Sequence, residues 1–199
     1  TVSPSWSDRS FGTVTGSDGR WIVKIKTPKG SNKSYTLKIT DSNKGEKVLS
    51  DVLVGEVWLC SGQSNMEHPM KGFSASEPVQ DSAKELSDAD YPQFRYFKVP
   101  RDVSRVPRYD TGESSWKSCS RDNAKDFEAI AFFFGRRIHK ALDVPVGIIG
   151  CAYGGSRIEG WMPPESFTKL AKNEYMDSDK LSDGENSASA PSNCWNAML

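Results

Sequence analysis

The sequence predicts an α/β protein in which a small antiparallel β module precedes a domain built on a parallel sheet. Residues 1–50 carry apolar side chains at every second position, which is typical of half-buried strands. From residue 51 onward, short apolar runs alternate with helical patterns, as strand–helix–strand units do. A hydrophobic content of 36%, with six Trp and nine Phe, can build a packed core. We therefore expect two regions, 1–50 and 51–199.

Composition excludes several classes of function. Lys plus Arg is 26 and Asp plus Glu is 26, so no net field favours nucleic acid or an anionic membrane surface. No apolar run approaches the about 18 residues that a membrane span needs, and residues 1–6 do not form a signal peptide. The cysteines lack C-x-x-C spacing, so we expect no zinc site and interpret those that end buried strands as small apolar core residues; the four are Cys60, Cys119, Cys151 and Cys194.

The β module is predicted from two alternating runs, 21–26 and 35–40. Turn signals at 17–19 and 29–32 bound the first run, and another at 42–45 ends the second. Lysines at the outward-facing positions indicate a solvated face rather than a ligand site. Because so few strands do not make a stable sandwich, we expect this module to be partial.

The second region is predicted to alternate strands and helices. The helix at 127–142 is the clearest element, since apolar side chains recur there at steps of three and four residues. A long polar connection occupies 101–123, and a polar loop occupies 177–192. The remaining expected elements are a buried strand at 57–59, a short helix at 83–86, strands at 94–99 and 144–151, and a helix that starts within 162–166.

Ser64 is the candidate nucleophile. It follows a predicted buried strand, and ligands bind open α/β sheets at the carboxyl ends of their strands. Gly62 lets the backbone turn tightly enough to present a hydroxyl. The alternative is that Ser64 only caps the following helix. The Gly154-Gly155 pair after the strand at 144–151 also has two interpretations. Two glycines there indicate either a close approach of the backbone to a ligand or a simple turn.

Several motifs resemble one family in the same order along the chain. The run GEVWLCSGQSNM at 55–66 resembles the nucleophile block of the sialate O-acetylesterases, members of the SGNH (GDSL-like) hydrolase superfamily; Gln63 stands where many of those relatives have Asp. The matching segments farther on are 94–100, 129–134, 144–149 and 154–162. The resemblance implies an SGNH-hydrolase-like three-layer domain, of which 51–199 would be the N-terminal portion, with its sheet incomplete.

The resemblance also implies a mechanism. Ser64 would attack an acetyl ester and form an acetyl-enzyme, with no metal and no cofactor. The backbone N–H groups of Ser64 and Gly155 would hold the oxyanion, Gly154 would set the turn, and Gln63 and Asn65 would support the serine. The expected substrate is an acetylated carbohydrate, either an O-acetylated sialic acid or acetylated xylan or another glycan. The competing hypothesis is a carbohydrate-binding module attached to an inactive esterase remnant.

The general base is the part that the sequence does not supply. Only His68 and His139 are present, and neither pattern places its ring at Ser64. In the family, an Asp-x-x-His block provides the base, and this block is absent here. We therefore expect the chain to be a piece of a larger esterase, whose remainder either forms a companion polypeptide that carries this block or has been removed. The resemblance further implies a secreted or periplasmic protein, or a lysosomal one in an animal. The balanced charge and the lack of a long apolar run indicate no nucleic-acid or membrane partner.

Overall fold

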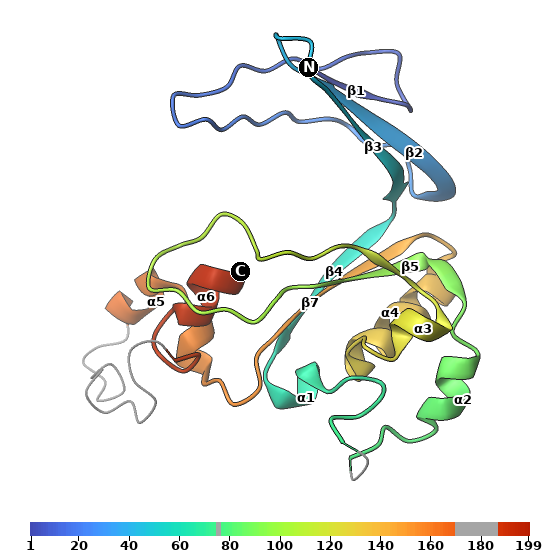
Figure 1. Ribbon diagram of the computed structural model, residues 1–199, viewed down its shortest axis with the longest axis vertical. Coiled ribbons are helices and arrows are strands. Elements are labelled where there is room, and N and C mark those ends of the chain that lie inside the picture. Colours follow the sequence, from blue (N-terminus) through green and yellow to red (C-terminus); the bar gives the residue numbers. More distant parts are fainter. Residues whose placement is uncertain (75–76, 170–186) are drawn as a thin grey trace.

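The computed structural model describes residues 1–74, 77–169 and 187–199. A three-stranded sheet near the N-terminus lies beside a unit in which helices surround a second sheet (Figure 1). The chain passes from one to the other at Gly55, where a Cβ atom would lie 2.0 Å from the carbonyl oxygen of Pro145. A glycine is needed at this crossing because any larger residue would collide with backbone.

The N-terminal sheet is antiparallel, as predicted, and has the order β1-β2-β3. Its strands are β1 (Val2–Pro4), β2 (Ser31–Thr40) and β3 (Glu46–Val54). The run at 35–40 lies in β2, but the strand expected at 21–26 is wrong: those residues form no strand, and the Trp21 side chain is exposed. Alternation does not suffice when no neighbouring strand offers a hydrogen-bonding edge.

The second sheet has the order β4-β7-β5-β6 among the described residues. Its strands are β4 (Glu56–Gly62), β5 (Tyr91–Lys98), β6 (Lys117–Cys119) and β7 (Val146–Ala152). Strands β4 and β5 both run parallel to β7, which confirms the predicted parallel sheet, while β6 adds an antiparallel strand beside β5.

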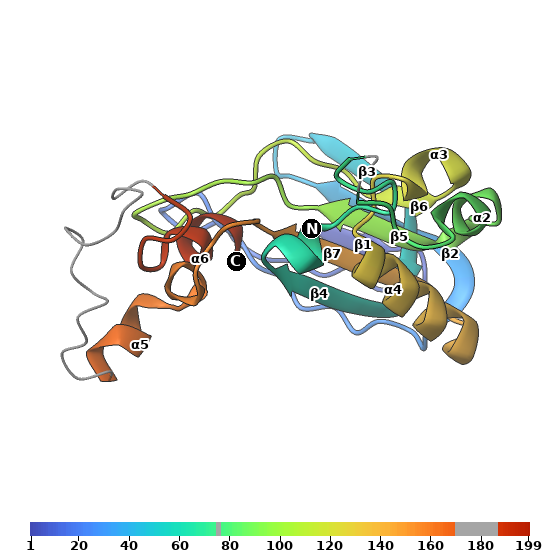
Figure 2. The same ribbon diagram turned by 90° about the horizontal axis from the view of Figure 1, so that it is seen from below.

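Helix α4 (Ala129–Leu142) covers one face of this sheet, as its periodicity predicted (Figure 2). Fully buried side chains from three elements meet there: Phe94 of β5, Phe132 of α4 and Ile148 of β7. Gly135 permits the close approach, since a Cβ atom on it would lie 2.6 Å from the Phe94 ring. The remaining helices are α1 (Ser64–Glu67), α2 (Ser82–Ser87), α3 (Arg121–Ala124), α5 (Pro164–Lys169), α6 (Asn193–Met198) and a 3₁₀ helix at Ile158–Trp161.

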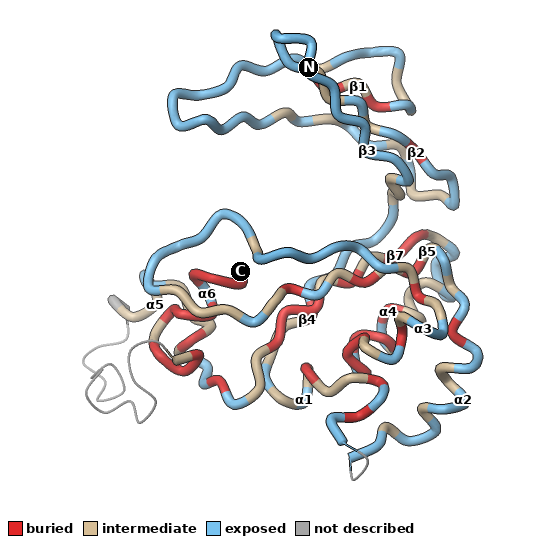
Figure 3. The backbone as a smooth tube through the Cα atoms, in the orientation of Figure 1, coloured by how far each residue is buried: buried red, intermediate tan, exposed pale blue. Residues whose placement is uncertain are grey.

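The opposite face of the sheet is covered near its carboxyl end by α6, where a smaller core forms around Val99, Cys151 and Met198. Figure 3 shows buried residues in α4, β7 and α6, whereas most residues of the N-terminal sheet are exposed. All four cysteines are buried and outside disulfides, which confirms the interpretation of Cys60 and Cys151, the two expected at strand ends, as core residues.

Strand β4 differs from its expected burial. The run at 57–59 was expected to be a buried strand, yet Val57 is 63% exposed, Trp58 42% and Leu59 53%. Among the described residues β4 is an edge strand that pairs with β7 alone. The composition of β4 is apolar, as in an interior strand, although only one of its two hydrogen-bonding edges is paired. Most of the polar loop expected at 177–192 lies outside the described residues, which resume at 187.

Candidate active site

Ser64 lies where β4 turns sharply into α1. The side-chain oxygen of Gln63 accepts the Ser64 N–H at 2.9 Å and also accepts a short hydrogen bond from the Ser64 hydroxyl. Gln63 is therefore the N-cap of α1, so the alternative role of Ser64 as that cap is wrong. Gly62 fits this turn because a Cβ atom on it would lie only 3.0 Å from Cβ of Met66.

The Gly154-Gly155 turn lies directly beside Ser64. A Cβ atom on Gly154 would lie 3.6 Å from both Cα and Cβ of Ser64. The Tyr153 N–H also donates to the Gly62 carbonyl at 3.0 Å, so the segments that follow β4 and β7 are hydrogen-bonded to each other. Two motifs that are far apart in the sequence thus meet at one edge of the sheet.

The two glycines differ in what their backbones do. The Gly154 N–H donates to Oε2 of Glu67 at 2.7 Å. Gly155 has φ +79°, in the left-handed region that favours glycine, and its carbonyl accepts from the Ser189 hydroxyl at 3.4 Å. Gly155 is exposed, as is Asn65 on α1. The roles expected for these residues in catalysis remain predictions.

Glu67 and Arg101 belong to this site, and sequence reasoning missed both. Glu67 is only 3% exposed, and its Oε1 accepts a short hydrogen bond from Nε of Arg101. This hydrogen bond raises the pKa of Arg101 above its ordinary value. The Arg101 guanidinium also lies over the Tyr153 ring, 5.1 Å from its centroid. The position of Glu67, one helical turn after Ser64, was the only sequence signal available.

A second buried carboxyl group, that of Glu128, lies at the start of α4. Glu128 is 1% exposed and lies beside the Tyr96 hydroxyl under Gly150, where a Cβ atom would be 2.0 Å from Tyr96 Oη and 2.9 Å from Glu128 Oε2. Among the described residues, neither Glu128 oxygen nor the Tyr96 hydroxyl has a hydrogen bond of ordinary geometry. Burial raises the pKa of Glu128 to about 7 and also raises that of Tyr96.

Both histidine rings are held away from the proton of Ser64. Nε2 of His68 lies 3.0 Å from the Glu77 carbonyl oxygen, and its ring stacks on Phe73 at 4.9 Å. Nδ1 of His139 lies 2.7 Å from the carbonyl oxygen of Val144, which precedes β7 and is thus at the opposite end of the sheet from Ser64. Neither ring contacts Ser64, in agreement with the expectation from the sequence.

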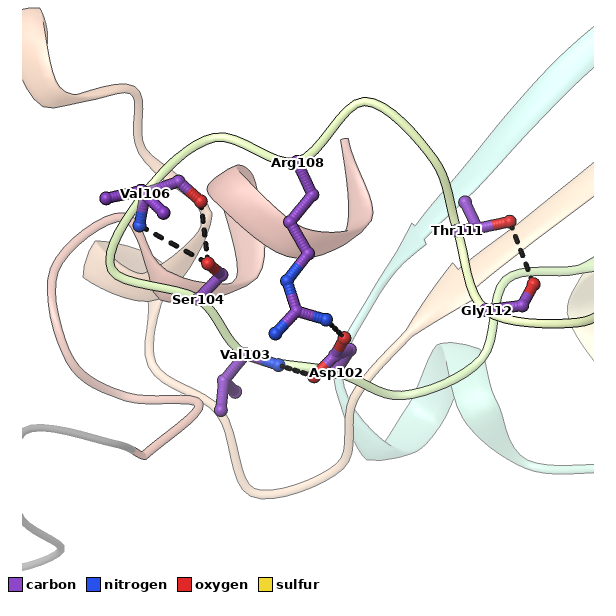
Figure 4. Close-up of polar contacts among 7 residues, drawn as sticks. All are labelled: Asp102, Val103, Ser104, Val106, Arg108, Thr111 and Gly112. Atoms are coloured by element: carbon purple, nitrogen blue, oxygen red, sulfur yellow. Dashed lines mark hydrogen bonds and ion pairs between the residues drawn. The ribbon is translucent and has the colours of Figure 1, made fainter.

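The segment at 101–116 begins beside the site at Arg101 and then crosses to α6. Figure 4 shows Asp102 paired with Arg108 and accepting the Val103 N–H, at 2.8 Å in the second case. The backbone N–H groups of Ser104 and Arg108 donate to carbonyl oxygens within α6, at 3.1 and 2.7 Å. These contacts fix a segment that has little regular structure of its own.

Other kinds of site are not evident among residues 1–74, 77–169 and 187–199. No cluster of three His, Cys, Asp or Glu side chains suited to a metal occurs in this described part. A hollow of about 580 Å³ lies between β3 and the starts of β4 and β7, at the end of the sheet remote from Ser64. No helix in the described part is long and apolar enough to cross a membrane.

Comparison with known proteins identifies related sequences and structures. A family model described as carbohydrate esterase, sialic acid-specific acetylesterase, matches residues 54–180. The sialate O-acetylesterase of Rattus norvegicus is 31% identical over 159 residues, which are 75% of this chain and 28% of that protein. The sialate O-acetylesterase of Mus musculus is 36% identical over 119 residues, 56% of this chain and 21% of that protein.

A solved structure extends the comparison to the whole chain. The crystal structure of a carbohydrate acetylesterase from Xanthomonas citri aligns with a TM-score of 0.81 and 30% identity, covering 100% of this chain and 40% of that one. This chain therefore has the fold of part of that enzyme. It spans less than a third of the length of the curated relatives, given the 28% and 21% above.

Proposed function

Because the chain belongs to the sialic acid-specific acetylesterase family of carbohydrate esterases, we propose that it removes O-acetyl groups from sialic acid or related sugars. The observation that carries this proposal is the position of Ser64 directly beside the Gly154-Gly155 turn. A serine next to backbone N–H groups of a glycine turn is the arrangement that acyl transfer requires.

The chemistry follows from this geometry. The Ser64 hydroxyl attacks the acetyl carbonyl carbon, a base takes the hydroxyl proton, and the sugar oxygen leaves with a proton. Water then attacks the acetyl-Ser64 carbonyl, which releases acetate and restores the hydroxyl. The N–H groups of Ser64 and Gly155 would stabilise the oxyanion in both steps. The side-chain oxygen of Gln63 accepts from both the N–H and the hydroxyl of Ser64, so the exposed Gln63 side chain must rotate away when an ester binds.

The base is assigned to a companion polypeptide carrying an Asp-x-x-His block. His68 and His139 are both engaged elsewhere, and the loss of its base costs a serine esterase several orders of magnitude in rate. We also propose that the protein acts outside the cytoplasm, in a secreted, periplasmic or, in an animal, lysosomal setting. No cofactor is required by this chemistry.

Acetylated xylan or another glycan is the second candidate substrate. The structural relative from Xanthomonas citri is described only as a carbohydrate acetylesterase, and this description does not specify a sugar. A carbohydrate-binding module with an inactive esterase remnant is the competing class, favoured because the rings of both histidines contact backbone carbonyls of other segments instead of Ser64.

The test compares wild-type protein with Ser64→Ala, and uses Ser42→Ala in an exposed turn as the matched control. Intact-mass spectrometry of the assembled protein from its source first identifies any companion chain. We then expect Ser64→Ala to abolish release of acetate from p-nitrophenyl acetate and from 9-O-acetyl sialic acid, with a melting temperature within about 3 °C of wild type. A fluorophosphonate should label Ser64 in the wild-type protein and in Ser42→Ala, and should not label Ser64→Ala.

Three results would contradict the proposal in separate ways. Activity above about a tenth of wild type in Ser64→Ala would remove Ser64 from the mechanism. Absence of both labelling and turnover in the assembled wild type would favour the binding-module alternative. Full activity of the isolated chain would remove the companion polypeptide and require one of the two histidines to act as the base.

A further inference from the structure

We propose that Glu67 is a positioning residue: its buried carboxylate, held by Arg101, fixes the Gly154-Gly155 turn at Ser64 and thereby orients the Gly155 N–H toward the oxyanion. This inference rests on the proposed ester hydrolysis at Ser64. It assigns a role to the Glu67–Arg101 ion pair, which takes no direct part in the proposed reaction.

The two oxygens of the Glu67 carboxylate contact different parts of the site. Oε2 accepts the Gly154 N–H at 2.7 Å, and Oε1 accepts from Nε of Arg101. Hydrogen bonds to an ionised acceptor are roughly twice as strong as neutral ones. Because Glu67 is 3% exposed, water competes little for either oxygen.

Glu67 is rigidly connected to the nucleophile. Helix α1 spans only four residues, Ser64–Glu67, and the Glu67 N–H donates to the Gln63 carbonyl at 3.0 Å. The carboxylate therefore moves with Ser64, and its bond to Gly154 sets the spacing between the nucleophile and the glycine turn. The shape of the site agrees, since a Cβ atom on Gly154 would lie 2.8 Å from Oε2 of Glu67.

This bond determines which glycine can serve the oxyanion. The Gly154 N–H is occupied by Glu67 and is not available to substrate. Within the described residues no acceptor bonds the Gly155 N–H, and the exposed Gly155 is held at φ +79°. An N–H that is fixed in direction before the reaction stabilises an oxyanion without reorganisation at the moment of attack.

Stability alone does not account for this pair. The Arg101 side chain is 49% exposed, so solvent screens its attraction for the Glu67 carboxylate and weakens what the ion pair adds to stability. Burying the Glu67 carboxylate has a desolvation cost that so exposed a partner does little to offset. A preorganised turn beside the nucleophile is a benefit that does not depend on net folding stability.

The experiment uses the assembled protein and two substitutions of Glu67, with Glu113→Gln at an exposed position as the control for loss of charge. Glu67→Leu removes both hydrogen bonds, whereas Glu67→Gln keeps an oxygen that can accept the Gly154 N–H. The readouts are kcat and KM for p-nitrophenyl acetate, and hydrogen exchange of the Gly154 amide by NMR, which needs no activity.

We expect Glu67→Leu to lower kcat by about 10²–10³ with KM within about threefold, as loss of an oxyanion donor does. The kcat of Glu67→Gln should be at least about tenfold higher than that of Glu67→Leu, and the kcat of Glu113→Gln should match that of wild type. The Gly154 amide should exchange at least about tenfold faster in Glu67→Leu than in wild type, because it loses its acceptor. If Glu67→Leu does not fold, Glu67→Gln decides by the same two readouts. Its neutral oxygen is a weaker acceptor than a carboxylate, so kcat should fall about tenfold and the Gly154 amide should exchange faster than in wild type; no change in either would overturn the proposal.

Unchanged Gly154 exchange in Glu67→Leu would overturn the proposal, and so would faster exchange with unchanged kcat. A wild-type protein that neither turns over ester nor reacts with fluorophosphonate would instead refute the proposed esterase function. In that case the exchange measurement still shows whether Glu67 fixes the turn, so the two failures are distinguishable.

Discussion

The buried carboxyl group of Glu128 should make the stability of the protein fall as pH rises. Its pKa is about 7 in the folded protein against an ordinary value of 4.5, and burial is the main cause. Between these values the folded state holds a proton that the unfolded state has lost, so the free energy of unfolding decreases with pH. The stabilising contribution is complete below about pH 4.5 and is lost once pH exceeds about 7.

The magnitude follows from the difference between the two pKa values. A difference of about 2.5 corresponds to about 3–4 kcal/mol, at about 1.4 kcal/mol for each pKa unit. The neighbouring charged groups partly cancel, since Lys98 on β5 lowers the pKa of Glu128 and Glu67 on α1 raises it. The other ionisable groups around the carboxyl are Tyr96 on β5, Cys60 on β4 and Cys151 on β7, and burial raises the pKa of all three, so they stay neutral in this range.

The substitution Glu128→Gln isolates this effect, because the amide has nearly the same shape and does not titrate. Urea unfolding of wild type, Glu128→Gln and the exposed control Glu113→Gln should be measured at pH 5 and pH 8. We expect the stability of Glu128→Gln relative to wild type to rise by about 2–3 kcal/mol from pH 5 to pH 8, while that of Glu113→Gln relative to wild type stays constant. A relative stability of Glu128→Gln that does not change with pH would refute the argument.

Two further predictions concern glycines. Gly135→Ala should destabilise the protein by about 1–3 kcal/mol, seen as a lower urea midpoint, because its Cβ atom would lie 2.6 Å from the Phe94 ring and 2.9 Å from Ile148; an unchanged midpoint would show that α4 shifts freely on the sheet. Gly155→Val should disrupt acetate release, since a β-branched residue is strained at φ +79°; survival of acetate release would leave Gly155 with a turn-forming role alone.

The sequence predicted those parts of the fold in which the signal is local. The periodicity of 127–142 identified α4, and the apolar runs at 94–99 and 144–151 identified β5 and β7. The exposure of Trp58 could not be predicted in this way, because it depends on which strands lie beside β4 rather than on β4 itself. Trp21 shows the same limit, since its alternating run found no partner strand.

The residues of the candidate site likewise differ in whether a local sequence signal marks them. Ser64 and the two glycines were found from their motifs, whereas Arg101 lies 34 residues from Glu67 in the sequence and forms part of an irregular segment. No periodicity or spacing connects an arginine in such a segment to a glutamate in a short helix. A carboxylate one helical turn after a candidate nucleophile was the only local signal, and it is shared by many helices whose glutamates are merely solvated.

The register of the parallel pair explains why the two motifs meet. Gly62 lies opposite Ala152 where β4 and β7 end together, so Ser64 and Gly154 follow their strands by equal steps and emerge at the same edge. A slip of one residue between the strands would separate the serine from the glycine turn and would reverse the faces of every side chain in β4. The bond from Tyr153 to Gly62 and the one from Gly154 to Glu67 both act at this point, just beyond the last paired residues. The geometry proposed for ester hydrolysis is therefore set by strand pairing first and refined by the Glu67 carboxylate.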